Sequence, residues 1–178
     1  MLLLAAYSIS SARAQDDAAI RQRLCRAILS EGAEQKQLLG EISETGSKLV
    51  HDVLAAWTRD SVYLYDAPDG SKLPILLEDQ TDADGKARAI RIDNGKFLAD
   101  DKNIELHLDA TTLTSAETDA TLRSLIRQAM DTLALSDPNP DARASAVQKL
   151  GNSQKLTNIP ILQARLTKEI NANVKKSI

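Results

Sequence analysis

The spacing of hydrophobic and polar residues changes twice along the chain. In residues 15–60, apolar side chains recur every three or four positions, which is the spacing of one helical face. In residues 61–109 the period falls to two, which is typical of half-buried strands. In residues 110–178 the helical spacing returns. We therefore expect a mainly α protein with a small antiparallel β insert, an α+β fold in which short helical hairpins flank the β unit.

The N-terminal helical part contains two strong amphipathic patterns with a weaker helical segment between them. Asp16 and Asp17 suit the first turn of the first helix, and Gly40 is expected to interrupt the weaker segment, EQKQLLGEIS. The predicted inward faces consist of Ile20, Leu24, Ala27 and Ile28 and then of Leu49, Val50, Val53, Leu54 and Trp57.

The β-rich part has four strand-like segments separated by turn sequences. SVYLYD, KLPILLED, ARAIRID and IELHLD are rich in strand-forming residues, and APDG, DADG and the Asn94-Gly95 pair separate them. Pro74 lacks an N–H, so it is expected at an edge or at a strand start.

The C-terminal helical part opens with a long amphipathic stripe. Thr114 and Glu117 form a predicted capping box ahead of it, and Pro138 and Pro140 end that helix and begin the next, which Gly151 closes. The stripe consists of Leu122, Leu125, Ile126, Ala129, Met130 and Leu133, and a final helix should turn Ile161, Leu162 and Leu166 inward.

Two segments of this part resemble one another. NPDARASA begins at Asn139 and NANVKKSI begins at Asn171, 32 residues later. Helical hairpins repeated at such intervals stack into HEAT-like solenoids. On this interpretation the chain is truncated within a repeat. The last helix is then short and frayed, and Val174 and Ile178 lie uncovered.

Composition and charge narrow the class of protein. Aromatic residues make up only 3% of the chain, so the core must be aliphatic, and a net charge of −3 argues against nucleic-acid binding. Cys25 is the single cysteine and is expected to fill space on an apolar helix face. The mature chain has no segment of the ~18–20 apolar residues that a membrane span requires.

Residues 1–14 have the pattern of a signal peptide. An apolar run ends in Ala12-Arg13-Ala14, which suits cleavage before Gln15, although no basic residue precedes the run. The alternative is a mildly apolar, frayed N-terminus.

No constellation of residues predicts an enzyme, a cofactor or a metal. His51 and His107 have no partner at metal-ligand spacing, and no phosphate-binding loop is present. In QTDADGKARAIR, a calcium loop would place Gln80 and Arg91 where two key ligands belong, so a hairpin turn is favoured. The lysines near the C-terminus (Lys168, Lys175, Lys176) indicate a solvated helix face or, if a membrane segment followed, contact with anionic lipid.

The order of these parts resembles the periplasmic N-terminal region of permease subunits of bacterial urea ABC transporters, relatives of the branched-chain amino-acid permeases. LALSDPNPDARASAVQKL carries the resemblance most strongly, with LAAWTRDSVYLYD and the leader ending ARAQDD in support. The β insert is longer than this resemblance leads us to expect, and the transmembrane part is absent from the 178 residues.

The resemblance implies an exported, periplasmic region of an inner-membrane protein that contributes to urea uptake by binding or bracing. Its implied partners are a second permease, cytoplasmic ATPases and a periplasmic urea-binding protein. The alternative is a free-standing exported helical-repeat module that binds another protein.

Overall fold

The computed structural model describes the backbone of residues 4–178 and the side chains from Asp16 onward. The helices are α1 (Leu4–Leu29), α2 (Gly32–Ser43), α3 (Lys48–Thr58), α4 (Ala120–Leu135), α5 (Pro140–Asn152), α6 (Asn158–Lys168) and α7 (Ala172–Ser177), with a 3₁₀ turn at Ala110–Thr112. The strands are β1 (Val62–Asp66), β2 (Lys72–Thr81), β3 (Ala87–Arg91), β4 (His107–Leu108) and β5 (Thr114–Ser115). The predicted α+β fold is confirmed.

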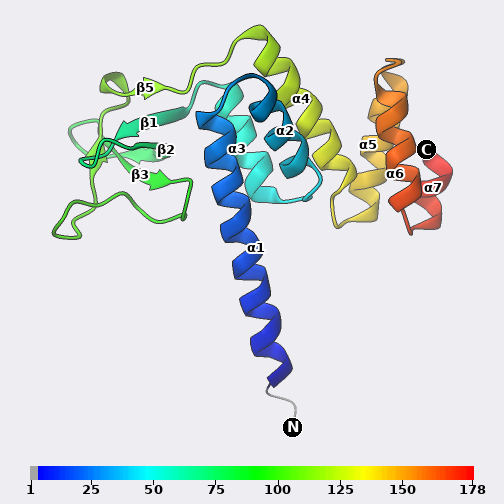
Figure 1. The fold of residues 1–178 in the computed structure, drawn as a ribbon, viewed down its shortest axis with the longest axis horizontal. Coiled ribbons are helices and arrows are strands. Elements are labelled where there is room, and N and C mark those ends of the chain that lie inside the picture. The colour runs from blue at the N-terminus through cyan, green and yellow to red at the C-terminus, as the bar shows by residue number, and fades with distance from the viewer. Residues whose placement is uncertain (1–3) are drawn as a thin grey trace.

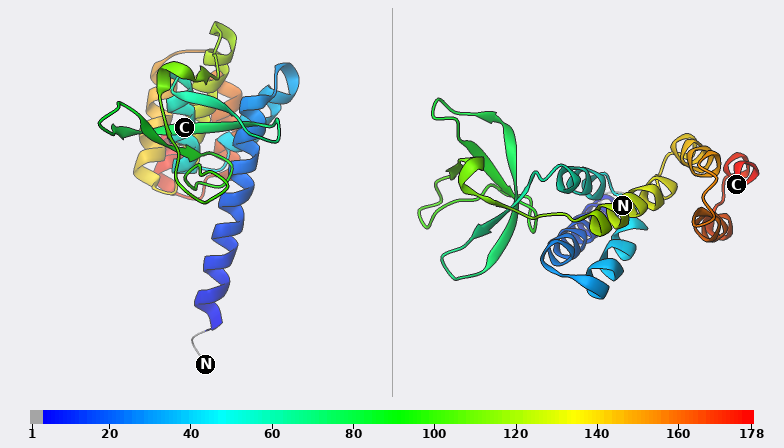
Figure 2. Two further views of the ribbon diagram at one scale, coloured as in Figure 1. Left: turned by 90° about the vertical axis from the view of Figure 1, so that its left-hand side faces the viewer. Right: turned by 90° about the horizontal axis from the view of Figure 1, so that it is seen from above.

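Three groups of elements follow one another along the molecule. The sheet lies at one end, α1 to α4 form the middle, and α5 to α7 lie at the other end (Figures 1 and 2). The first half of α1 projects away from the rest of the molecule (Figure 1).

The middle group forms the main core because its helices turn their predicted apolar faces toward one another. Trp57 is 1% exposed and Leu24 is fully buried. Ile126, the most buried residue of the predicted stripe, lies in the same cluster, whereas Leu125 is only partly buried beside it. Cys25 also lies in this core, as predicted.

Two local predictions in the N-terminal part were wrong. α1 begins at Leu4, so Asp16 and Asp17 lie inside the helix and not in its first turn. α2 runs through Gly40 without interruption, because its inward face (Leu38, Leu39 and Ile42) is anchored in the core and outweighs the ~1 kcal/mol helix penalty of one glycine. The predicted leader, residues 1–14, lies outside the residues whose side chains are described, and its cleavage before Gln15 stays a prediction.

The sheet separates the main core from a smaller one. Its strand order is β4-β3-β2-β1-β5, and the neighbours pair antiparallel. Successive side chains of a strand point to opposite faces, so Val62 and Leu64 pack on the main core while Tyr63 and Tyr65 pack with Ile75 on the other face. The Asn94-Gly95 pair lies in a hairpin turn, with Gly95 at a φ of 73°, but the loop spans residues 92–95 and is longer than the two-residue turn expected, because the Arg91 amide donates to the Lys96 carbonyl.

Both edges of the sheet differ from the prediction. Within IELHLD only His107 and Leu108 form a strand. The predicted capping box is also wrong. Thr114 lies in β5, where it pairs with Leu64 of β1. Asp119 caps α4 instead, and its carboxylate accepts a hydrogen bond from the Leu122 amide. The sheet thus continues past residue 109, the predicted end of the β-rich part, because β1 still had a free edge to pair.

The terminal helices enclose a second core, made of Leu135, Ala146, Val147, Leu150 and Val174. Asn139 caps α5, and Pro140 occupies its first turn as predicted. Two predictions fail here. Leu166 is 42% exposed, and the residue expected to lie uncovered, Val174, is 1% exposed because α7 packs against α5.

The loop between α2 and α3 touches the loop between α4 and α5 very closely. Gly46 adopts a φ of 63°, and a Cβ at this position would collide with the carbonyl oxygen of Ser136. Only glycine fits this approach without movement of the backbone. Among the described residues, no helix has the length and apolar character needed to cross a membrane.

Candidate functional site

The two histidines lie on the surface, each beside one aspartate carboxylate. His51 lies on α3 with a 57% exposed side chain, 3.3 Å from the Asp52 carboxylate. His107 lies in β4, where its Nδ1 is 2.7 Å from a carboxylate oxygen of Asp82. Both are partly solvated surface side chains, as predicted. Within residues 16–178, no three His, Cys, Asp or Glu side chains gather closely enough to hold a metal ion.

The predicted calcium-loop sequence forms a hairpin turn. One Asp82 carboxylate oxygen accepts hydrogen bonds from the backbone amides of Lys86 and Asp84. The Lys86 bond contributes most to the lowered pKa of Asp82; desolvation opposes the shift, and the bonds with His107 and Asp84 add to it. Gly85 closes the turn at a φ of 77°. One carboxylate oxygen of Asp82 is therefore occupied by the turn itself and the other by His107, and the hairpin interpretation is confirmed.

Cys25 has an inert environment. Burial, followed by the charge of Asp93, raises the pKa of the Cys25 thiol to about 12. The reactive form of cysteine is the thiolate, so this thiol is a poor nucleophile at neutral pH.

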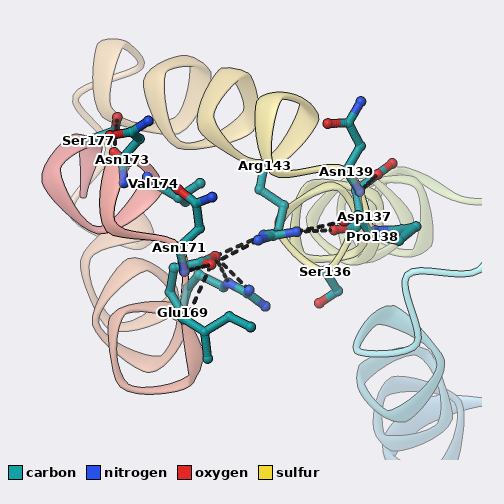
Figure 3. A network of polar contacts seen from close by, with 12 residues as sticks. Ser136, Asp137, Pro138, Asn139, Arg143, Glu169, Asn171, Asn173, Val174 and Ser177 are labelled. Atoms are coloured by element: carbon teal, nitrogen blue, oxygen red, sulfur yellow. Dashed lines mark hydrogen bonds and ion pairs between the residues drawn. The ribbon is translucent and has the colours of Figure 1, made fainter.

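The most strongly organised polar cluster joins α5 to the loop between α6 and α7 (Figure 3). At its centre is Glu169, whose side chain is 0% exposed. Arg143, from α5, donates to both Glu169 carboxylate oxygens at 2.8 Å from Nε and Nη2. Arg165, from the last turn of α6, donates to Oε2 at 2.6 and 3.1 Å. We call Arg143, Arg165 and Glu169 the buried ion cluster.

Backbone groups complete this cluster on both sides. The amides of Ile170 and Asn171 donate to Glu169 Oε1 at 3.0 and 2.8 Å. The remaining nitrogen of the Arg143 guanidinium, Nη1, donates to the carbonyls of Asp137 and Pro138. The cluster therefore fixes the α4–α5 loop, α5 and the α6–α7 loop relative to one another.

The charges of the cluster are fixed near neutral pH. Such charges are suited to holding structural elements together and not to general acid–base catalysis. The hydrogen bonds from Arg143 hold the pKa of Glu169 far below its ordinary value; burial opposes this shift, and the bonds from Asn171 and Arg165 add to it. The Glu169 carboxylate in turn raises the pKa of Arg143. Neither side chain changes its charge near neutral pH, and a general acid or base must do so.

The geometry around this cluster occurs twice, 32 residues apart. The Asp137 carboxylate accepts from the Asn139 amide at 2.7 Å, and the Glu169 carboxylate accepts from the Asn171 amide at 2.8 Å. Asn139 then caps α5, and Asn171 caps α7. The two helix starts thus share an acidic residue two positions before a capping asparagine.

Sequence reasoning found the two asparagines but missed Arg143 and Glu169 as a pair. Their 26-residue separation has no periodic signature. The available signal was the match of Asp137 and Glu169 at the same 32-residue interval, just before the aligned segments.

One hollow is lined by residues of α3, α4 and α5. It has a volume of about 300 Å³. Two of its lining residues, Lys149 and Asp131, form an exposed ion pair at 3.1 Å. The other lining residues are His51, Met130, Ala134, Ala142, Ser145, Ala146 and Leu150.

The lining of this hollow offers no nucleophile activated by a base, because Ser145 donates its hydroxyl to the Asp141 carbonyl within its own helix.

When the chain is compared with known protein families, with curated proteins and with solved structures, it matches none of them.

Proposed function

We propose that the chain is the exported, soluble region of a permease subunit of a urea-type ABC transporter, and that it works there as a binding or bracing scaffold. The observation that supports this proposal best is the helix start repeated after 32 residues, with its acidic residue and capping asparagine. The first copy of this helix start lies within LALSDPNPDARASAVQKL, the segment that carries the resemblance most strongly.

The packing of the terminal helices favours a scaffold over an enzyme. α7 packs on α5 as the next hairpin of a helical repeat would, and Val174 and Val147 meet in one small core. Stacked hairpins of this kind present continuous surfaces that bind other proteins. The buried ion cluster ties α5 to the loops before it and after α6, and such joints suit a bracing element.

In this role the chain itself performs no chemistry and does not form the urea pathway. Its partners are the second permease, the ATPases and the urea-binding protein of the transporter. Contact with the membrane would come only through a transmembrane part outside these 178 residues.

An in-frame deletion of codons 16–178 in the producing organism tests this function. We expect uptake of radiolabelled urea to be lost, uptake of leucine to be unchanged, and the intact gene to restore urea uptake. As a matched control, Lys149→Gln, which removes only an exposed ion pair, should transport urea normally. Urea uptake that survives the deletion would refute the transporter role.

The second candidate is a free-standing exported helical module that binds another protein, which the exposed apolar residues of α6 favour. Affinity purification of the tagged protein from membrane extracts separates the two. Recovery of the permease and ATPase subunits supports the first candidate, and recovery in the soluble periplasmic fraction without them supports the second. Mass spectrometry of either fraction checks the export prediction, since the mature protein should begin at Gln15.

A further inference from the structure

Asn94 differs from every other asparagine of the chain in the residue that follows it. Only Asn94 precedes a glycine, Gly95, whose backbone nitrogen has no side chain beside it. A side chain at that place hinders the approach of the backbone nitrogen to the asparagine side chain, and a proline there has no N–H. The residues that follow the other six asparagines are Ile104, Pro140, Ser153, Ile159, Ala172 and Val174.

The turn exposes this pair of residues and holds the Asn94 side chain over the backbone. Asn94 and Gly95 are both exposed, so water reaches them. The Asn94 side-chain oxygen accepts a hydrogen bond from the Lys96 amide at 2.9 Å. A bond of this kind curls an asparagine side chain back over the peptide bond that follows it, here the Asn94–Gly95 bond. The same bond polarises the side-chain carbonyl, so its carbon is more open to attack by a nucleophile.

A cation without a carboxylate partner lies against this turn. The Arg21 guanidinium, from α1, donates to the Ile92 carbonyl at 3.2 Å. A Cβ added to Gly95 would lie 2.7 Å from Arg21 Cζ, so the guanidinium is in direct contact with the glycine. Within residues 16–178, Arg21 forms no ion pair with an aspartate or a glutamate.

We propose that Asn94 is a site of spontaneous deamidation, and that the carboxylate formed there pairs with Arg21. The Gly95 backbone nitrogen attacks the carbonyl carbon of the Asn94 side chain and forms a C–N bond. The side-chain NH₂ group leaves as ammonia with the proton of the Gly95 amide, and a five-membered imide ring remains. Water then opens the ring, at the side-chain carbonyl to give aspartate or at the backbone carbonyl to give isoaspartate. The reaction consumes one water, releases one ammonia and needs no oxidant or reductant.

The Arg21 guanidinium favours this reaction because negative charge forms beside it at each stage. The attacking nitrogen loses its proton, the side-chain oxygen is negative in the tetrahedral intermediate, and the final product is a carboxylate. A cation already held in place stabilises such charge without further rearrangement. One contact opposes the reaction. The Gly95 amide donates to the Arg91 carbonyl at 2.9 Å, and this bond must break before the nitrogen attacks.

The product changes the contact between α1 and the sheet. α1 now meets this turn through bonds to neutral backbone carbonyls, from Arg21 to Ile92 and from Gln22 to Asp93. A carboxylate at position 94 gives the guanidinium a partner of opposite charge. Because Arg21 is already fixed at the turn, the pair forms with little further loss of side-chain freedom. Deamidation therefore stabilises the packing of α1 on the sheet.

Incubation of the purified 178-residue protein at mildly alkaline pH, followed by peptide mapping with mass spectrometry, tests the site. The peptide that contains Asn94 should exchange ammonia for water, and labelling by an isoaspartyl methyltransferase should reveal the isoaspartate. Asn103 is the control within the same protein, because it is equally exposed in a loop but precedes isoleucine. We expect Asn94 to deamidate about tenfold faster than Asn103 or more.

Matched variants test the part played by Arg21. Arg21→Gln removes the charge and should slow deamidation of Asn94 about threefold or more, whereas Arg21→Lys keeps a cation and should react faster than Arg21→Gln. Arg23→Gln is the control for the loss of a cation from α1, since Arg23 lies 4.0 Å from Glu41, and it should leave the rate unchanged. Circular dichroism should confirm that each variant is folded.

A substitution that imitates the product tests the new ion pair. Asn94→Asp should raise the Tm by about 2 °C, and this gain should be absent when Arg21→Gln is also present. Added salt should reduce the gain.

Three outcomes would overturn the inference. The first is an unmodified Asn94 in the folded protein after a free peptide of residues 91–96 has been fully converted. The second is an Arg21→Gln variant that deamidates as fast as the unchanged protein. The third is an Asn94→Asp variant whose Tm is unchanged, or whose gain in Tm persists without Arg21.

Discussion

Replacing Glu169 by glutamine should destabilise the C-terminal helical part more than any other substitution that keeps the shape of a side chain. The substitution changes one carboxylate oxygen to an NH₂ group. All six polar contacts of the carboxylate are with donors, three on each oxygen. Whichever way the amide is turned, its NH₂ group therefore faces donors.

The size of the effect follows from the burial of the partners. Arg143 is 7% exposed, so it would stay buried without a countercharge. Removing one partner of a buried ion pair costs about 3–5 kcal/mol. Since whole domains are stable by only ~5–15 kcal/mol, we expect Glu169→Gln to unfold α5 to α7 at a much lower denaturant concentration.

Two spectroscopic signals distinguish local from global unfolding. Trp57 is the only tryptophan, and it lies in the main core with α1 to α4, so its fluorescence reports on that core. Circular dichroism at the helical band reports on all helices. In urea, the variant should lose part of its helical signal before the Trp57 fluorescence changes, whereas the unchanged protein should show transitions that lie closer together.

The matched control is Lys149→Gln, which removes a cation on α5 whose side chain is 76% exposed and whose partner is Asp131. Exposed pairs contribute ~0–1 kcal/mol, so the control should unfold like the unchanged protein. If the free energy of unfolding of Glu169→Gln lies within about 0.5 kcal/mol of that of the control, the ion cluster is not the joint that we describe.

Three further predictions concern other contacts. Gly46→Ala should lower the Tm by several degrees in differential scanning calorimetry, because its Cβ would collide with the Ser136 carbonyl at a positive φ, and Gly40→Ala, in open space on α2, should not. Acid titration should separate the unchanged protein from Glu169→Gln. The lowered pKa of Glu169 means that its stabilisation is complete above the ordinary pKa of about 4.3 and is lost as the pH falls through the folded pKa. Below pH ~4 the two should therefore converge in stability, and a constant gap would contradict the pKa direction. Trp57→Phe should lower the free energy of unfolding, measured in urea, by about 1–3 kcal/mol, because it leaves the Ala116 carbonyl without the 2.9 Å hydrogen bond from the indole. An unchanged unfolding midpoint would show that this bond contributes nothing.

The sequence alone determined the elements whose signals are local. The period of three to four residues predicted α3 and α4, the period of two predicted β1 and β2, and the Asn94-Gly95 pair predicted a hairpin turn. Pro140 and its preceding asparagine fixed the start of α5. Each of these signals acts within about one helical turn or one strand, so its effect on local structure depends little on the surrounding residues.

Tertiary structure decided the features that depend on a distant partner. Thr114 has the sequence of a helix cap, but the free edge of β1 recruits it into β5. Gly40 has the sequence of a helix break, but burial of the neighbouring leucines carries α2 through it. Local propensities are worth about 1 kcal/mol, and burial or strand pairing at these positions outweighs them.

The candidate site shows the same division. The 32-residue interval and the capping asparagines could be predicted, because each cap is satisfied within its own loop. The ion pair between Arg143 and Glu169 could not, because the two residues lie 26 positions apart, and the local pair that Glu169 makes with Arg165 does not point to Arg143. Which surface of α6 faces the second core was likewise decided only when α5 and α7 packed together, since both of its faces carry leucine and isoleucine. When a helix carries apolar residues on two sides, its sequence does not determine which side is buried. The packing of the neighbouring helices determines it.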